Sequence, residues 1–216
     1  MNSAATEVLF DELLKNSDDL DLFLTMHYGF NAIYENLCLE FFFDCLVPRL
    51  QKKINEYNTV NSHKLKLNVC APDKRRELLA PYGGLGISSK NAWPEKLAIF
   101  LESGSSGCRI FYAGVTMDQS KGDLGSMAGP FEQGFRESFK TVSSYKQGQK
   151  YIFCDYPSRN WDSQKMFPAL VKDVLARRSS EDAQCPTADR YVEMLMALVT
   201  ITDKVVKDTC SGSDLN

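Results

Sequence analysis

Hydrophobic positions recur at helical spacing over residues 1–58, which indicates a helical first segment. Ser17 is followed by two aspartates, and carboxylates are favoured at the positive end of a helix, so we expect a helix to begin there. Gly29 is predicted to end it. A longer helical pattern follows, and Pro48 is expected to kink or split that helix near Val47, because proline donates no backbone hydrogen bond.

After residue 63 the period changes from that of a helix to that of a strand. Leucine and lysine alternate from Lys64, which is typical of a strand with one buried face. A short polar turn or helix is expected over 72–79, and the Ser/Gly run at 103–107 predicts a hairpin loop. The glycine-rich residues 118–130 are expected to form an exposed, mobile loop. Strands are predicted at 65–69, 84–88, 96–102, 108–117 and 151–155, the last closed by Pro157.

Two helices are predicted near the C-terminal end, one around Leu170 and Val174 and one over residues 187–206. Because helices and strands do not alternate along the chain, the order favours an α+β fold rather than a parallel α/β fold. The expected architecture is a mostly antiparallel sheet of about four to six strands, flanked by N-terminal and C-terminal helices. We expect a single α+β domain over 1–210, helical at 1–58, sheet-rich at 63–156 and helical at 161–208, with 211–216 as a frayed tail.

Composition narrows the class of protein. The chain has 216 residues, of which 44% are hydrophobic and 25% charged, so a packed core is expected. The formal net charge of -3 does not favour nucleic acid as a partner, although local binding stays possible. Seven scattered cysteines without a C-x-x-C pair indicate free thiols in a reducing compartment. With no leader pattern and no membrane-length apolar run, we expect a cytoplasmic protein without a membrane partner.

The sequence offers little to catalysis. His27 and His63 are the only two histidines, and a structural role is the better interpretation of each. No nucleophile elbow, phosphate-binding loop or zinc-protease motif occurs. No Asp or Glu is followed two residues later by the lysine that a metal-dependent nuclease would use. We therefore predict no catalytic residue, no metal ligand set and no cofactor, and a non-enzyme is favoured over an enzyme.

Aromatic residues in loop-like stretches are the remaining candidates for binding. Trp93 precedes a proline, and Trp161 lies in a stretch that also contains Tyr156 and Arg159. Trp, Tyr and Arg are the residue types that most often anchor interfaces, so these four are the predicted binding residues. In the competing interpretation each tryptophan fills the edge of the core.

Several short motifs resemble one family of the PD-(D/E)XK nuclease superfamily of bacteria and phages. They are Gly86-Ile87-Ser88 followed by Trp93, the strands Leu97–Glu102 and Phe111–Val115, Asn160–Ser163, and the helical stretch Phe41–Tyr57. The likeness is to the C-terminal, non-catalytic half, and the catalytic half has no counterpart in this chain. The resemblance implies a stand-alone recognition module in a bacterium–phage conflict setting, and it implies no catalytic residue.

The leading hypothesis is a non-enzymatic binding or regulatory protein that contacts a macromolecular partner, either another protein or a second copy of itself. The first alternative is a divergent metal-dependent nuclease or nuclease accessory subunit, whose ligands would be Glu102, Asp118 and Asp155. The second alternative is a sequence-tolerant nucleic-acid binder that uses Lys64, Lys66 and the basic run 74–76.

Overall fold

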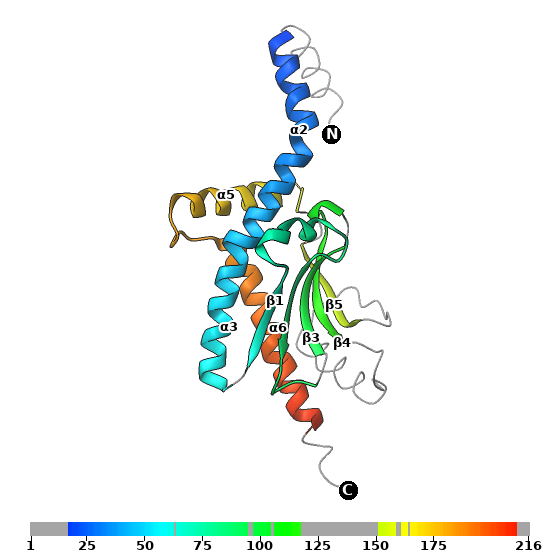
Figure 1. Ribbon diagram of the computed structural model, residues 1–216, viewed down its shortest axis with the longest axis vertical. Coiled ribbons are helices and arrows are strands. Elements are labelled where there is room, and N and C mark those ends of the chain that lie inside the picture. Colours follow the sequence, from blue (N-terminus) through cyan, green and yellow to red (C-terminus); the bar gives the residue numbers. More distant parts are fainter. Residues whose placement is uncertain are drawn as a thin grey trace. The chain divides into compact units, whose positions relative to one another are not determined.

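The computed structural model describes residues 17–62, 64–94, 97–104, 106–117, 151–158, 161–163 and 165–210 (Figure 1). In this part the α-helices are α2 (Ser17–Glu40), α3 (Val47–Asn61), α5 (Met166–Ser179) and α6 (Pro186–Cys210). The strands are β1 (Leu65–Val69), β2 (Gly84–Ser89), β3 (Leu97–Ser103), β4 (Phe111–Met117) and β5 (Tyr151–Ser158). A π-helix η1 (Phe41–Leu46) and the short 3-10 helices η2 (Pro72–Leu79) and η3 (Ser106–Cys108) complete the order.

The chain divides into two compact units, Met1–Asn36 and Leu37–Asn216. The described residues of the first unit belong to helix α2, which passes through Gly29 without a break. The prediction that Gly29 ends a helix was therefore wrong. Glycine in a helix interior costs only about 1 kcal/mol relative to alanine, and Gly29 does not adopt the left-handed conformation that terminates helices. The sheet and the other helices lie in the second unit.

Pro48 changes the helix as expected. Helix α3 begins at Val47, and the six residues before it form the π-helix η1, in which the Val47 N–H donates to the carbonyl of Phe42, five residues back. Proline has no N–H to donate and its ring crowds the carbonyl four residues earlier, and a widened turn relieves both problems. Five of the six η1 residues are buried, so the irregular turn lies inside the core.

The five strands form one antiparallel sheet in the order β1-β2-β3-β4-β5. This confirms the α+β class, the antiparallel sheet and the flanking helices. Each strand pairs with its neighbour in sequence, so the hairpin predicted between β3 and β4 is present. Strand β5 continues past Pro157, where a register irregularity interrupts its pairing with β4. Proline is tolerated there because β5 is the last strand of the described sheet. Residues 118–130 lie outside the described part.

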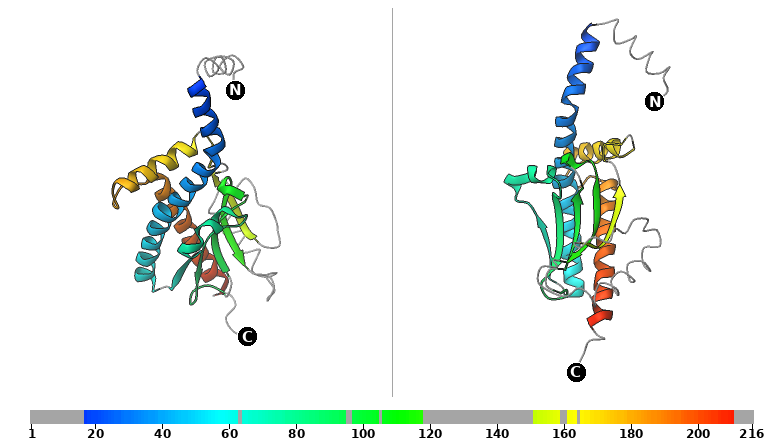
Figure 2. Two further views of the ribbon diagram at one scale, coloured as in Figure 1. Left: turned by 45° about the horizontal axis from the view of Figure 1, so that its top comes forward. Right: turned by 90° about the vertical axis from the view of Figure 1, so that its right-hand side faces the viewer.

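Helices α3 and α6 pack on one face of the sheet (Figure 2). The register places alternate strand residues on that face, and they are almost fully buried. They are Leu85, Ile87, Leu97, Ile99, Leu101, Phe111, Ala113 and Val115. The helices contribute Leu50 and Ile54 from α3 and Leu195, Leu198 and Val199 from α6. The core of the second unit therefore lies between the sheet and this helical layer. Among the described residues no helix is both long and apolar enough to cross a bilayer.

Candidate functional site

Trp161 lies in the core and not on an exposed loop. Its side chain has 0% exposure and is surrounded by Phe41, Phe111 and Tyr191, with a ring-centroid distance of 4.0 Å to the stacked ring of Phe111. Its indole N–H donates to the Tyr191 hydroxyl at 2.7 Å, which satisfies its one polar group. The expectation that Trp161 is an exposed anchor is corrected: Phe41 and Tyr191, remote in sequence, form the pocket that covers it.

Trp93 is also a core residue, with 6% exposure. Its indole N–H donates to one carboxylate oxygen of Asp203 in α6, and the Tyr57 hydroxyl of α3 donates to the other. Burial, followed by the hydrogen bond to Asp203, raises the pKa of the Tyr57 hydroxyl. Through Asp203, Trp93 therefore links the segment between β2 and β3 to both α6 and α3. The expectation that Trp93 is exposed is likewise corrected.

The two other predicted binding residues are less informative. Tyr156 lies within strand β5, which extends beyond the predicted end at residue 155. Arg159 lies outside the described residues. The four predicted residues thus do not form one exposed loop surface, since both tryptophans face the core.

Strand β1 has an open edge, and its geometry follows from one side chain. Asn58 of α3 accepts a hydrogen bond from the Leu65 N–H at 2.9 Å and donates to the Leu65 carbonyl at 3.0 Å. The backbone groups of Leu65 therefore point away from β2. Because these directions alternate along a strand, the N–H and C=O groups of Leu67 and Val69 point the same way. No described strand lies on that side, since β1 is the first strand of the sheet.

The side chains around this edge are accessible. Lys66, Asn68 and Val69 are exposed, and Leu67 is half-buried. Lys66 and Asn68 lie on the sheet face opposite the helices, where the Asn68 amide donates to the Ser88 hydroxyl at 3.0 Å. Leu67 and Val69 lie on the helix side, in register with Ile87 and Leu85. The open edge thus offers backbone hydrogen-bonding groups, with the apolar side chains of Leu67 and Val69 on one face of the sheet and the polar side chains of Lys66 and Asn68 on the other.

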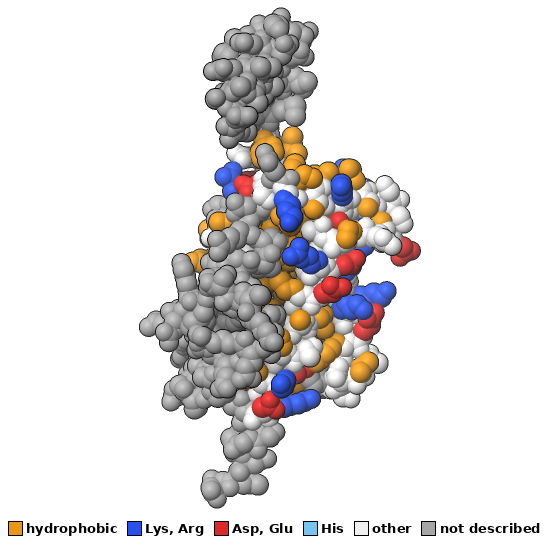
Figure 3. Space-filling view, turned by 180° about the vertical axis from the view of Figure 1, so that it is seen from behind, with side chains coloured by type: hydrophobic (Ala, Val, Ile, Leu, Met, Phe, Trp, Pro, Cys, Tyr) orange, Lys and Arg blue, Asp and Glu red, His pale blue; other side chains and the backbone are white. Residues whose placement is uncertain are grey.

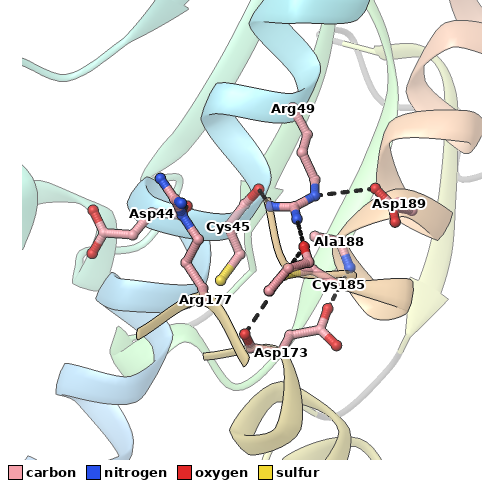
Figure 4. A network of polar contacts seen from close by, with 9 residues as sticks. Asp44, Cys45, Arg49, Asp173, Arg177, Cys185, Ala188 and Asp189 are labelled. Carbon is pink, nitrogen blue, oxygen red and sulfur yellow. Dashed lines mark hydrogen bonds and ion pairs between the residues drawn. The ribbon is translucent and has the colours of Figure 1, made fainter. Parts of the chain in front are cut away.

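A second polar concentration lies where α3 meets the connection between α5 and α6 (Figure 4). The Arg49 guanidinium donates to the carbonyls of Cys45 (3.1 Å) and Ala183 and pairs with Asp189 at 3.2 Å. Asp173, which is 1% exposed, accepts the Ala188 N–H at 2.9 Å in the first turn of α6. These contacts join η1, α3, α5 and α6 and cap a helix, so the network stabilises the fold.

The ionisable groups of this network are not poised for nucleophilic chemistry. Burial, and secondarily the neighbouring Cys185 thiol, raises the pKa of the Cys45 thiol to about 12, so it stays protonated at neutral pH. Burial also raises the pKa of the Asp173 carboxyl, although the Ala188 and Thr187 N–H groups act in the opposite direction. Within the described part of the chain, one Asp173 oxygen has no hydrogen-bond partner. A buried neutral thiol and a helix-capping carboxyl are structural features.

A cavity of about 470 Å³ adjoins the network. Its lining includes Arg177, Arg178, Glu40 and Asp44, so opposite charges are mixed. Arg178 pairs with Glu40 at 2.8 Å, and the Arg177 side chain donates to the Asp44 carbonyl at 3.0 Å. Because both signs of charge line it, the cavity offers no concentrated charge of one sign to a ligand.

The acidic residues proposed for the nuclease alternative are only partly described. Glu102 lies on β3 and accepts a hydrogen bond from the Tyr112 hydroxyl at 3.3 Å. Asp155 lies on β5, two strands away from Glu102 in the sheet order, and Asp118 is outside the described residues. Within the described ranges no three His, Cys, Asp or Glu side chains gather closely enough to hold a metal ion. The metal-dependent nuclease therefore gains no support from the described geometry.

Basic and acidic side chains are interspersed on the described part of the face seen in Figure 3. That face shows no large basic patch of the kind that nucleic-acid binding needs. Comparison of the chain with protein-family models, with curated proteins and with solved structures finds no match in any of the three. Functional inference therefore depends on the geometry of this molecule.

The open edge of β1 was not among the predicted binding features. Sequence reasoning found the strand and singled out Lys64 and Lys66, but as nucleic-acid contacts. Which strand lies at the edge of a sheet depends on pairings between distant segments. The alternation of lysine with leucine was an available signal, because lysine is frequent on edge strands.

Proposed function

We propose that the protein is a non-enzymatic binding or regulatory protein whose macromolecular partner adds a strand to the open edge of β1. The observation that carries the proposal is the direction of the Leu67 and Val69 backbone groups, which follows from the hydrogen bonds of Asn58 to Leu65. A peptide strand placed beside β1 would form up to four backbone hydrogen bonds with these two residues, two donated by their N–H groups and two accepted by their carbonyls. Such bonds supply affinity in strand addition, and alternate side chains supply specificity.

The length of the edge suits a selective, regulated contact. Asn58 already occupies the backbone groups of Leu65, and helix η2 begins at Pro72, shortly after the strand ends. The accessible edge is therefore short, which limits unspecific aggregation through long unpaired strands. A partner needs additional side-chain contacts to bind stably, and Val69 with 37% exposure offers an apolar one.

The recognition role implied by the resemblance to nuclease accessory regions is compatible with strand addition. A bacterium–phage setting and a nuclease partner remain predictions from that resemblance. A partner-binding accessory chain needs no catalytic residue of its own.

The substitution Val69→Pro tests the proposal. Proline removes the outward-facing N–H and places its ring at the open edge, while the bonds of Lys66 and Asn68 to β2 remain. Val69→Ala is the matched control, because it shortens the side chain and keeps the N–H. We expect wild-type protein and Val69→Ala to retain the same partner from native cells, and Val69→Pro to lose it with a similar melting temperature.

Amide hydrogen exchange provides the direct readout. In the complex, the N–H groups of Leu67 and Val69 should become protected, because they donate to the added strand. If Val69→Pro retained the partner, and the Leu67 and Val69 amides stayed unprotected in the wild-type complex, binding would use another surface.

A further inference from the structure

The beginning of β1 carries an accumulation of positive charge. Lys64 and Lys66 are exposed, and Lys90, immediately after the β2 residue that pairs with Leu65, is exposed as well. Among the described residues none of the three forms an ion pair. If a partner adds a strand to this edge, as proposed above, these lysines lie close to the added segment and select its charge.

The register determines which residues of an added strand would meet the lysines. Leu67 and Val69 would form the hydrogen-bonded pairs with an antiparallel partner, so Lys66 would stand in a non-hydrogen-bonded pair. Side chains in such pairs lie closer together, with Cα atoms about 4.5 Å apart. Lys66 points to the face opposite the helices, and Lys64, two residues earlier, lies on the same face. A partner residue on that face would therefore meet one or both ammonium groups.

We propose that the open edge of β1 binds an extended acidic segment, with a carboxylate opposite Lys66 that the side chain of Lys64 on the same face can also reach. Apolar residues at the intervening positions would face Leu67 and Val69 on the helix side. Opposite charges across a strand pair stabilise it, whereas an uncharged segment would leave the lysines without a counter-charge.

Two other occupants fit the edge less well. A second copy of the chain would bring its own β1, whose residues 64–69 contain no carboxylate, and would place four lysines close together. A nucleic acid would satisfy the lysines, but its phosphates would be repelled by the outward-facing carbonyls of Leu67 and Val69. A peptide strand carries N–H groups that pair with those carbonyls, which is why we favour it.

The test uses a fluorescent peptide of about eight residues that alternates valine with glutamate, and a matched peptide with glutamine for glutamate. We expect the purified wild-type protein to bind the glutamate peptide about tenfold more tightly in fluorescence anisotropy. The variant Lys64→Gln/Lys66→Gln should bind both peptides equally. The control variant Lys165→Gln/Lys172→Gln removes the same charge from the α5 region and should retain the preference.

The possible outcomes separate the two proposals. Equal binding of both peptides, each lost in Val69→Pro, would overturn the acidic preference and leave strand addition intact. Glutamate-dependent binding that persists in Val69→Pro would overturn strand addition and the acidic strand together. Absence of binding to wild-type protein at millimolar peptide would overturn the acidic-segment proposal, and the partner retention experiment would then decide strand addition. If the wild-type protein bound single-stranded DNA tightly and did not bind the glutamate peptide, the lysines would form a nucleic-acid site. That result would overturn the acidic-segment proposal.

Discussion

Trp161 shows at the scale of one residue why the type of a side chain does not by itself reveal its role. Tryptophan is common both at interfaces and in cores, because a large apolar ring carries one polar N–H. In this protein Tyr191, on a helix remote in sequence, accepts that N–H, and Phe111 stacks against the ring. A satisfied donor and 0% exposure make Trp161 a stabilising residue.

We expect Trp161→Ala to lower the free energy of unfolding by about 3–5 kcal/mol, because it opens a large cavity in the core. Tyr191→Phe keeps the ring but leaves the indole N–H without its acceptor, and should cost about 1–3 kcal/mol. Urea titration followed by circular dichroism measures both values. Leu175→Ala, at a side chain with 55% exposure, is the control and should change stability by less than about 0.5 kcal/mol. An unchanged midpoint for Trp161→Ala would contradict the core role.

At the scale of elements, the junction between η1 and α3 depends on a side chain from a third element. Pro48 cannot donate to the carbonyl of Asp44, four residues earlier, and the Arg177 side chain of α5 donates to that carbonyl at 3.0 Å. A contact across 133 residues thus satisfies a group that the helix itself leaves unpaired. The packing of α5 against η1 is consistent with this role.

A double-mutant cycle tests this substitution of donors. Arg177→Met removes the side-chain donor, whereas Pro48→Ala supplies a backbone N–H to the same carbonyl. We expect Arg177→Met to cost less in the Pro48→Ala background, with a coupling energy of about 0.5–1.5 kcal/mol from chemical denaturation. Arg178→Met is the matched control, because Arg178 pairs with the Glu40 side chain, and its effect should be additive with Pro48→Ala. Additive effects of Arg177→Met as well would disprove the exchange of donors.

At the scale of the whole molecule, the titration of the Asp173 carboxyl makes the free energy of unfolding depend on pH. Its pKa is raised by burial, so the folded state retains the proton at pH values where the unfolded chain has lost it. The contribution of this carboxyl to stability is therefore complete below the ordinary pKa of aspartate. It declines as the pH rises from that value through the raised pKa of the folded state.

The substitution Asp173→Asn removes this titration and keeps an acceptor for the Ala188 N–H. We expect the stability of the wild-type protein relative to Asp173→Asn to fall as the pH increases from about 4, the ordinary pKa of aspartate, through the raised pKa of the folded state. Urea unfolding at several pH values measures the difference, and Asp182→Asn, at an exposed position, controls for the change in net charge. A wild-type advantage that grows with pH would show that Asp173 is stabilised as a carboxylate.

The sequence by itself determined the elements of this protein and their class. The change of period near residue 63, the alternation over 65–69 and the glycine-rich hairpin at 103–107 are local signals, and each corresponds to an observed element. Pro48 predicted the change of helix near Val47 for the same reason, since its missing N–H acts within one turn. Helices and strands do not alternate along the chain as they do in βαβ units, and this order also predicted an antiparallel sheet.

Only the tertiary structure decided which side chains are buried and which backbone groups are available to a partner. The burial of Trp93 and Trp161 depends on Asp203 and Tyr191, which are 110 and 30 residues away in sequence. The open edge of β1 depends on the sheet order and on Asn58, which occupies the backbone of Leu65. These properties arise from contacts between separate elements, and local periodicity carries no information about which elements meet. For that reason the pattern located strand β1, whereas its role as a candidate binding edge emerged only from the assembled sheet.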